Sequence, residues 1–414
     1  MRILLIHQFF LEDNDGGGSR WNEMSRIWTQ AGHEVTVLAG MVHYMGQRPD
    51  RYKGRYFHKS TNQDGVRVIR CHVSESYNSS FLGRLWAYFS FTCSSSWAGL
   101  RYATDRYDCL VVTSPPLFVG ITALLLSWGK RIPFLFEVRD LWPESAIATG
   151  VLTNPTVIRF AYWFEALVYR RAKTINVLTP AFRDALLQKH VPEEKIIFIP
   201  NAADFALSEE LLTTFDVAAF RRQHALDSRF VITYVGAHGV ANHLEQVLET
   251  ADLLRDTNVL FLLIGDGMKK KELMQQAQDM NLSNVRFIDS VPKRTVFTYI
   301  LASQMGASVL KKTDTFKTVY SNKTFDYFSC KKPVLMAIDG VSRELVETAE
   351  AGIFVEPENP HDFAQKIRLY LAHPEWLAQQ GENGYQYART HFDRDVLARQ
   401  YLAHLESWDA RKSL

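Results

Sequence analysis

Short apolar runs alternate with helical patterns twice along the chain, and this alternation limits the folds that it can adopt. An apolar run of strand length followed by apolar residues at helical spacing, as in "HLEQVLETADLL", is typical of a parallel sheet with helices on both faces. Two such series in 414 residues predict two domains, because a chain of this length exceeds one ordinary core. The predicted fold class is α/β, with two doubly wound parallel sheets.

The strands and domain limits follow from the same pattern. Pro and Asn interrupt the pattern at "IPNAADF", which predicts domains of about 1–200 and 205–394. The chain is helical from Asp362 onward, and residues 395–414 are expected to cross back to the first domain. The predicted strands are Ile3–Phe9, Glu34–Leu38, Val66–Cys71, Cys109–Thr113, Phe134–Glu137, Thr174–Val177 and Ile196–Ile199, then Phe230–Tyr234, Val259–Ile264, Val285–Phe287, Ala307–Leu310, Pro333–Ala337 and Ile353–Val355.

Composition restricts the classes of partner and the compartment. The net charge of +2 gives no support for nucleic-acid binding, although basic residues exceed acidic ones in the first 200 residues, which suits an anionic partner. Four cysteines without metal-ligand spacing fit a reducing compartment. Neither a signal peptide nor a run of about 18 apolar residues is recognisable. We therefore expect a cytoplasmic protein, with peripheral attachment to the inner face of the cell membrane as an option.

Ligands of open α/β sheets bind beyond the carboxyl ends of the strands, so the loops there are the candidate sites. The first such loop carries Gly16, Gly17 and Gly18, and we expect Gly17 and Gly18 to face an anion or a sugar. A merely tight turn is the alternative. The loop is not a dinucleotide fingerprint, because "GGGSRW" lacks the G-x-G-x-x-G spacing and the following strand "EVTVLAG" ends without an acid.

Two stretches of the second half suit a phosphate ligand. In "GAHGVANHL" we expect Gly236, Gly239 and His238 to face a phosphate at a helix start, with His238 on the rim as the alternative. In "SNKTFDYF", a helix capped by Ser321 would direct the amides of Asn322 and Lys323 outward, with Asp326 one turn on. That arrangement suits a nucleoside diphosphate; a plain capped helix with a surface Lys–Asp pair is the alternative. The lysines at 269–271 are expected to be solvated.

The order of these motifs resembles the family 4 retaining glycosyltransferases of the GT-B fold. The resemblance runs from "IHQFF…GGGSR…AGHEVTVLAG" through "RDLWPES", "VLTP…IPNAADF" and "LLIGDG…VRFIDSVPK" to "KTFDYFSCKKPVLM". It is greatest to the bacterial branch that builds O-antigen, lipopolysaccharide, capsule and related polysaccharides, which includes amino-sugar transferases. The resemblance implies two Rossmann-like domains that face a cleft, with the donor bound by the second domain and the acceptor by the first.

The resemblance also implies roles for individual residues. Asp326 occupies the position of the family's ribose-binding acid, and Ser290 and Val291 match its base-binding segment. Thr318 stands where many members have a second Glu. The loop "GAHGVANHL" also lacks the family's usual Arg and Lys. The positive charge that neutralises the departing diphosphate is therefore expected from Arg139, Lys311 or Lys323.

In the family, the segment matching "RDLWPES" carries catalytic side chains. Arg139 would face the phosphate and Asp140 the acceptor or the sugar, with a structural salt bridge as the alternative. The catalytic set is then Arg139, Asp140 and Lys323. No metal-ligand spacing is evident, so we expect a metal-independent enzyme without a cofactor, with the nucleotide sugar as its substrate.

Basic and aromatic residues mark the acceptor side. The non-strand segment Arg48–Ser60 precedes an apolar helix over "FLGRLWAYFSFTCSSSWAGLRYA", a combination that suits an anionic membrane and a polyprenyl-diphosphate-linked acceptor. Packing of this helix on its own sheet is the alternative.

The expected activity is transfer of a hexosyl or N-acetylhexosaminyl group from a nucleotide sugar, with UDP favoured by the resemblance, to a glycan or lipid-linked saccharide. A non-hydrolysing sugar-nucleotide epimerase and a non-catalytic binding protein remain as alternatives.

Overall fold

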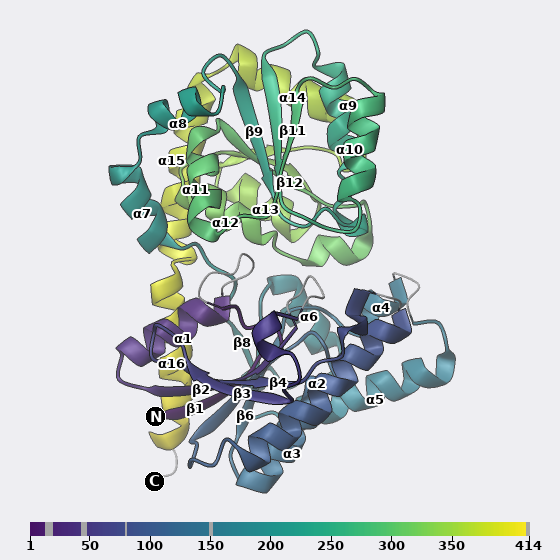
Figure 1. Cartoon of the computed structure of the whole chain (residues 1–414), viewed down its shortest axis with the longest axis vertical. Helices are drawn as coiled ribbons and strands as arrows, with labels where there is room; N and C mark the ends of the chain where they lie inside the picture. Colours follow the sequence, from purple (N-terminus) through teal and green to yellow (C-terminus); the bar gives the residue numbers. More distant parts are fainter. Residues whose placement is uncertain (13–19, 43–47, 79–80, 149–151, 411–414) are drawn as a thin grey trace. The chain divides into compact units, whose positions relative to one another are not determined.

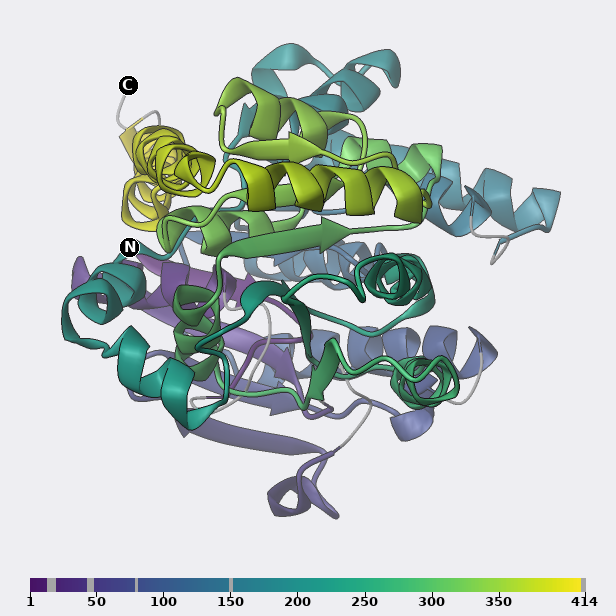
Figure 2. The ribbon, with the colours of Figure 1, turned by 90° about the horizontal axis from the view of Figure 1, so that it is seen from above.

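The computed structural model of the chain describes residues 1–12, 20–42, 48–78, 81–148 and 152–410. They form two compact units, Met1–Pro200 with Asp395–Leu414 and Asn201–Arg394, each of which is described by itself. Both are α/β units built on a sheet (Figures 1 and 2), so the predicted fold class is confirmed.

The first unit contains an eight-stranded sheet in the order β3-β4-β2-β1-β5-β6-β7-β8. Every pairing is parallel except that of β3 with β4. Its strands are β1 (Arg2–Ile6), β2 (Glu34–Gly40), β3 (Phe57–Thr61), β4 (Arg67–Cys71), β5 (Cys109–Thr113), β6 (Phe134–Val138), β7 (Thr174–Val177) and β8 (Ile196–Phe198). Its helices are α1 (Arg20–Gln30), α2 (Phe81–Arg101), α3 (Val119–Lys130), α4 (Glu144–Ala148), α5 (Pro155–Arg171), α6 (Pro180–Gln188) and α16 (Arg394–Ala410), with short turns η1 (Asp50–Tyr52), η2 (Glu75–Asn78) and η3 (Glu193–Lys195).

The prediction that Arg48–Ser60 contains no strand is wrong. The second half of this segment is β3, the antiparallel edge strand, and it is joined to β4 by a turn in which Asn62 Oδ1 accepts from the amides of Asp64 and Val66. The side chains of β3 are half-buried or exposed because the strand has only one neighbour, so it lacks the apolar run on which the prediction relied.

The C-terminal helix α16 packs in the first unit, as expected. Trp28 Nε1 of α1 donates to the carbonyl of Ala398 at 2.9 Å, and the buried ring of Tyr401 lies 5.6 Å from that of Trp28. Figure 1 shows α1 and α16 side by side, next to the N-terminus. The opposite face of the sheet is covered by α2, which contacts β2 and β4, and by α3, which contacts β5 and β6.

A buried ion pair fixes the carboxyl end of this sheet. Glu137 of β6 is fully buried, and its Oε2 accepts from Arg20 Nη2 at 3.0 Å and from Asn176 Nδ2 at 2.9 Å. Arg20 also donates to the carbonyls of Ile199 and Pro200, the last residues before the chain enters the second unit. The network therefore ties α1, β6 and β7 to the end of the first unit.

The second unit contains a six-stranded parallel sheet in the order β11-β10-β9-β12-β13-β14. Its strands are β9 (Phe230–Val235), β10 (Val259–Ile264), β11 (Val285–Ile288), β12 (Met305–Val309), β13 (Val334–Ala337) and β14 (Gly352–Phe354). Its helices are α7 (Phe205–Thr214), α8 (Val217–Gln223), α9 (Glu245–Leu253), α10 (Lys270–Asp279), α11 (Lys293–Ala302), α12 (Asn322–Ser329), α13 (Val341–Thr348), α14 (Pro360–Ala372) and α15 (Glu375–His391), with turns η4 (Val240–Asn242) and η5 (Asp314–Thr318).

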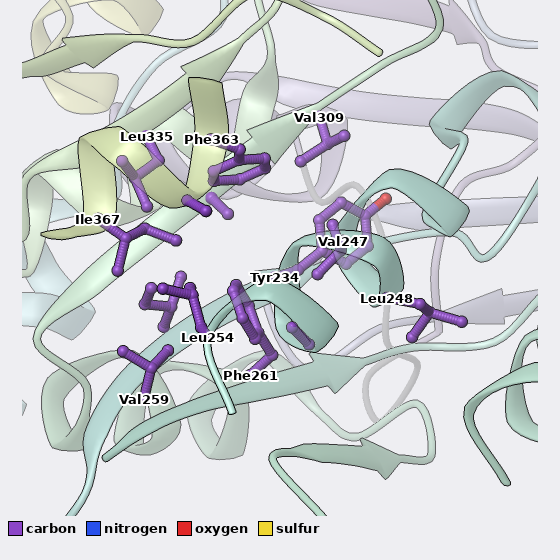
Figure 3. Close-up of a cluster of buried hydrophobic side chains, with 14 of the residues drawn as sticks. Tyr234, Val247, Leu248, Leu254, Val259, Phe261, Val309, Leu335, Phe363 and Ile367 are labelled. Carbon is purple, nitrogen blue, oxygen red and sulfur yellow. The ribbon is translucent and has the colours of Figure 1, made fainter. Parts of the chain in front are cut away.

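Apolar cores cover both faces of the second sheet, and a third, smaller cluster with Phe220 of α8 lies against β9 and β10. Helices α9, α10 and α14 form the core on one face, and α7, α11, α12, α13 and α15 form the core on the other. Figure 3 shows side chains of the first core, where Phe363 and Ile367 of α14 lie near Leu335 of β13. All thirteen predicted strands are present with ends shifted by at most a few residues, and β3 is the one strand of the described residues that was missed.

The buried ion pair gives a stability prediction. Glu137→Gln leaves the buried Arg20 guanidinium without its counter-charge, so we expect a loss of roughly 3–5 kcal/mol in the free energy of unfolding. Glu34→Gln, which removes half-exposed ion pairs with Arg2 and Arg67, should cost about 1 kcal/mol or less. Urea denaturation followed by circular dichroism measures the free energy of unfolding of both variants. Equal losses would contradict a stabilising role for the buried ion pair.

Candidate functional site

The strand order of the second sheet locates its ligand-binding edge. The chain proceeds from β9 outward to β10 and β11, then returns to the other side of β9 with β12. The order therefore reverses between β9 and β12, and the crevice beyond the carboxyl ends of these two strands is where open α/β sheets bind ligands. The candidate residues of the second half follow β9, β11 and β12 at this same edge.

The loops after β9 and β10 pack backbone against backbone. The amide of His238 donates to the carbonyl of Asp266, and the amide of Lys269 donates to the carbonyl of His238, both at 2.9 Å. A Cβ on Gly265 would lie 1.9 Å from the oxygen of Gly236, and one on Gly267 would lie 2.5 Å from that of His238. Gly265 and Gly267 also have positive φ. A side chain at either position of "LIGDG" would therefore displace the Gly236–Gly239 loop.

The Gly236–Gly239 loop does not begin an α-helix, contrary to prediction. Gly239 is followed by the turn η4, and α9 begins only at Glu245, so the helix dipole does not act on these amides. His238 is also not on the rim: its side chain is fully buried, and burial lowers its pKa to about 4. Its imidazole is therefore neutral, and neither ring nitrogen has a hydrogen-bond partner in the described part of the chain.

Helix α12 begins directly after Ser321, as predicted, but the Ser321 hydroxyl does not cap it. The hydroxyl donates to Ser308 Oγ of β12 at 3.2 Å, and the Ser321 amide donates to Ser342 Oγ at 3.0 Å. Among the described residues, nothing accepts a hydrogen bond from the amides of Asn322 and Lys323. The first turn of α12 thus keeps two donors available for a ligand.

Lys323 combines partial burial with proximity to the β9 loop. Its Nζ lies 4.8 Å from the centre of the Tyr234 ring, and a Cβ on Gly236 would lie 3.6 Å from it. Burial lowers the pKa of Lys323 to about 8, while Asp326 acts in the opposite direction. No carboxylate of the described residues forms an ion pair with it, so Lys323 is a cation held at the switch point of the sheet.

Four further candidate residues lie at the same edge of the second sheet as Lys323. Asp326 lies three residues further along α12 and is half-buried, while Asn322 is exposed and its Oδ1 accepts from Asn201 Nδ2 at 2.5 Å. Thr318 ends η5, and its hydroxyl donates to the carbonyl of Thr315 at 2.8 Å. The exposed Lys311 follows β12, where its amide donates to the carbonyl of Ala241 at 2.8 Å beside the β9 loop.

Ser290 and Val291 follow β11 at the outer strand of the same edge, Ser290 exposed and Val291 half-buried. The expectation of a solvated lysine cluster nearby is wrong for Lys270. Its buried Nζ donates to the carbonyl of Gly265 at 2.8 Å and to Asp289 Oδ1 at 2.5 Å, so it joins the loops after β10 and β11. The sequence did not reveal the burial of Lys270, because one lysine within a polar stretch leaves the periodic pattern of apolar residues unchanged.

In the first unit, Arg139 and Asp140 follow β6 at its carboxyl end. Asp140 Oδ2 accepts from Ser145 Oγ at 2.8 Å, and burial raises the pKa of this carboxyl. The two residues do not form an ion pair with each other within the described chain. Gly17 and Gly18 lie outside the described residues.

The predicted strand Ile3–Phe9 contains two polar residues for which the sequence predicted no contact with a ligand. His7 and Gln8 follow β1, and both are at least nine-tenths buried. Burial lowers the pKa of His7, and the charges of Arg139 and Arg70 lower it further. His7 Nδ1 and both amide atoms of Gln8 have no hydrogen-bond partner among the described residues. Buried polar atoms of this kind are rare in folded proteins and are candidates for ligand contacts.

The described residues contain no group of three His, Cys, Asp or Glu side chains placed to hold a metal ion. Metal independence therefore stays a prediction.

Two family models match the chain in succession. The description "Glycosyl transferase 4-like domain" covers residues 15–202, and "Glycosyl transferases group 1" covers residues 216–387. The chain belongs to the family 4 glycosyltransferases of the GT-B fold. Glycosyltransferase activity follows from this membership, and the resemblance stated from the sequence is confirmed.

Both curated relatives described here are named as glycosyltransferases, and the name of the first refers to a bacterial polysaccharide. The chain is 24% identical over 412 residues to the putative colanic acid biosynthesis glycosyl transferase WcaI of Escherichia coli, covering 97% of this chain and 99% of that one. The probable glycosyltransferase WbjE of Pseudomonas aeruginosa is 21% identical over 267 residues, which is 63% of this chain and 66% of WbjE.

Solved structures share the fold of this family member. Sucrose-phosphate synthase from Thermosynechococcus elongatus superposes with a TM-score of 0.76 at 17% identity, over 99% of each chain. Anabaena HepE in complex with UDP and glucose gives a TM-score of 0.73 at 18% identity, over 98% of this chain and all of that one.

The backbone packing of the two loops gives a second prediction. Gly265→Ala places a methyl group against the Gly236 carbonyl, so we expect a loss of about 3 kcal/mol or more and loss of UDP binding. Gly239→Ala in the same loop has negative φ and its nearest neighbour, Asn242 Oδ1, at 3.4 Å, so its Tm should change little. Thermal unfolding with and without UDP tests this; a Gly265→Ala protein with normal Tm would contradict the packing argument.

Proposed function

We propose that this glycosyltransferase moves a hexosyl or N-acetylhexosaminyl group from a UDP-linked donor, with retention of anomeric configuration, to a hydroxyl of a glycan or polyprenyl-diphosphate-linked saccharide. The reaction would serve bacterial surface-polysaccharide synthesis at the inner face of the cell membrane. The name of WcaI and the UDP complexes of HepE support the branch and the nucleotide.

One observation carries the proposal for the donor. At the switch point of the second sheet, the unpaired amides of Asn322 and Lys323 and the Lys323 ammonium lie at one helix start. A diphosphate there would receive backbone hydrogen bonds, the field of a helix N-terminus and a full positive charge. Asp326, one turn on, would bind the ribose hydroxyls.

The remaining donor contacts follow from the same edge of the sheet. Ser290 and Val291, after the outer strand β11, would hold the base, and the Gly236–Gly239 loop would approach the diphosphate and the sugar. His238 would act there as a neutral hydrogen-bonding group because its pKa is about 4. Lys311, exposed beside this loop, would add charge at the outer end of the diphosphate.

The chemistry requires stabilisation of a leaving group. The bond between the anomeric carbon and the diphosphate oxygen breaks toward an oxocarbenium-like state while negative charge grows on the β-phosphate. Lys323 and the α12 amides would stabilise that charge. The acceptor oxygen bonds to the anomeric carbon on the face that the diphosphate leaves, and its proton passes to the departing phosphate.

The first unit would supply the acceptor side of the reaction. Arg139 would add positive charge, and Asp140, His7 and Gln8 offer hydrogen-bonding groups for sugar hydroxyls. The unpaired buried atoms of His7 and Gln8 support this role, because a hydroxyl-rich ligand provides both donors and acceptors.

A panel of nucleotide sugars tests the activity. The full chain is incubated with UDP-, GDP- and ADP-sugars and a lipid-extract acceptor in the presence of EDTA, and we expect free UDP together with a glycosylated acceptor. Lys323→Met should lower the turnover rate at least about a hundredfold, as for removal of a group that stabilises transition-state charge. Lys271→Met, at an exposed lysine, is the control. An epimerised UDP-sugar, or binding without turnover, would refute the proposal.

The pKa of Lys323 gives a further prediction. Only the protonated side chain attracts the diphosphate, so UDP affinity should be full below pH 8 and fall as the pH rises above that value. At pH 9 we expect about a tenfold loss relative to pH 7, since roughly one lysine in ten is still protonated. Isothermal titration with UDP measures this, with uridine as the ligand without a phosphate.

In Lys323→Met the pH dependence specific to UDP should disappear along with most of the affinity for UDP over uridine. A pH dependence that persists in this variant would assign the effect to another group.

A further inference from the structure

The helix layer formed by α2, α3 and α5 exposes large aromatic and aliphatic side chains on its outer side. Trp128 is 84% exposed, and the others range from 52% to 63%. On α2, Trp86, Trp97 and Leu100 recur at helical spacing. We define this aromatic face by Trp86, Trp97, Leu100, Trp128, Phe160 and Trp163.

The three helices form one layer. Gly99 of α2 lies against Leu126 of α3, and a Cβ on Gly120 of α3 would lie 2.7 Å from Val168 of α5. Tyr169 of α5 packs on Phe136 of β6 with ring centres 6.1 Å apart, so α5 covers the same sheet. Figure 1 shows α2, α3 and α5 on one side of the first sheet. Their outer faces therefore share one surface.

The exposed charges that these three helices contribute to the surface are positive. The only acidic residue of the three helices is Glu165, which is buried and paired with Lys189. The exposed charges of these helices and of the residue after α3 are arginines, and in the described residues none of them forms an ion pair with a carboxylate. They are Arg101, Arg131, Arg159, Arg170 and Arg171.

The basic segment Arg48–Ser60 differs in this respect. Arg48 pairs with Glu75, Arg51 with Glu12, and Lys53 with Asp50. Three of its five basic side chains are thus already paired with carboxylates of the protein, so an anionic surface would gain less from them.

We propose that the aromatic face binds an anionic lipid bilayer. Tryptophan and phenylalanine side chains insert at the level of the lipid head groups, and uncompensated arginines attract the lipid phosphates. The described residues contain no helix that is both long and apolar enough to cross the bilayer, so this contact would be interfacial. The inference rests on the proposed function, because a lipid-linked acceptor gives the contact its purpose.

Co-sedimentation of the full chain with vesicles tests the inference. We expect binding to phosphatidylcholine vesicles that contain about 30% phosphatidylglycerol, little binding to phosphatidylcholine alone, and weaker binding at high salt. The double variant Trp128→Ser/Trp163→Ser should weaken binding at least about tenfold, as should Arg159→Gln/Arg170→Gln. The matched controls Leu212→Ser/Met274→Ser and Arg222→Gln/Arg399→Gln, at exposed positions off this face, should bind as the unchanged chain does.

The outcomes separate this inference from the proposed function. UDP binding without vesicle binding overturns the inference alone, and vesicle binding without sugar transfer overturns the proposed function alone. A dimer in analytical ultracentrifugation that the Trp128→Ser/Trp163→Ser variant dissociates would assign the face to a second copy instead. Loss of vesicle binding in Arg51→Gln/Lys53→Gln, with the arginine double variant unaffected, would move the contact to the β3 segment and also overturn the inference.

Discussion

The candidate donor site depends on the partly buried ammonium of Lys323, which forms no ion pair with a carboxylate of the described residues. Burial of an unpaired charge is costly, and here it is expressed as the lowered pKa of Lys323. The Tyr234 ring offsets part of that cost by a cation–π contact. An anionic ligand would offset more of it, because a phosphate restores the solvation that the ammonium has lost. A bound diphosphate would therefore remove part of the free-energy cost of burying the Lys323 ammonium.

The core of the second unit reaches this site through Tyr234. Figure 3 shows its ring near Val247 of α9 and Val309 of β12, and its hydroxyl donates to the carbonyl of Ala237 in the β9 loop at 2.9 Å. The Lys323 ammonium lies over the same ring. One buried aromatic side chain thus connects core packing, the conformation of the glycine loop and the position of the Lys323 ammonium.

The sequence was sufficient for most of the fold because buried parallel strands and amphipathic helices leave strong periodic signals. It failed at β3, whose residues at the sheet edge alternate weakly, and at the start of α9, where the η4 turn intervenes without a distinctive residue. At the site, the sequence located Lys323 and Asp326 by spacing along one helix. It could not find Lys270, His7 or Gln8, whose burial is decided by residues distant in the chain. Local patterns carry no information about such burial.

The departures from the family pattern fit one electrostatic argument. Thr318 stands in place of an acid, and the β9 loop lacks the usual Arg and Lys, so one negative and two positive charges are missing from this edge of the sheet. In the proposed mode of donor binding, Lys323 and Lys311, two basic residues near the β9 loop, would replace the cations. With Thr318 uncharged, less negative charge opposes them, and fewer cations are needed to neutralise a diphosphate. In the proposed mode of donor binding, the missing acid offsets one of the two missing cations, and Lys323 and Lys311 would supply the remaining attraction for the leaving group.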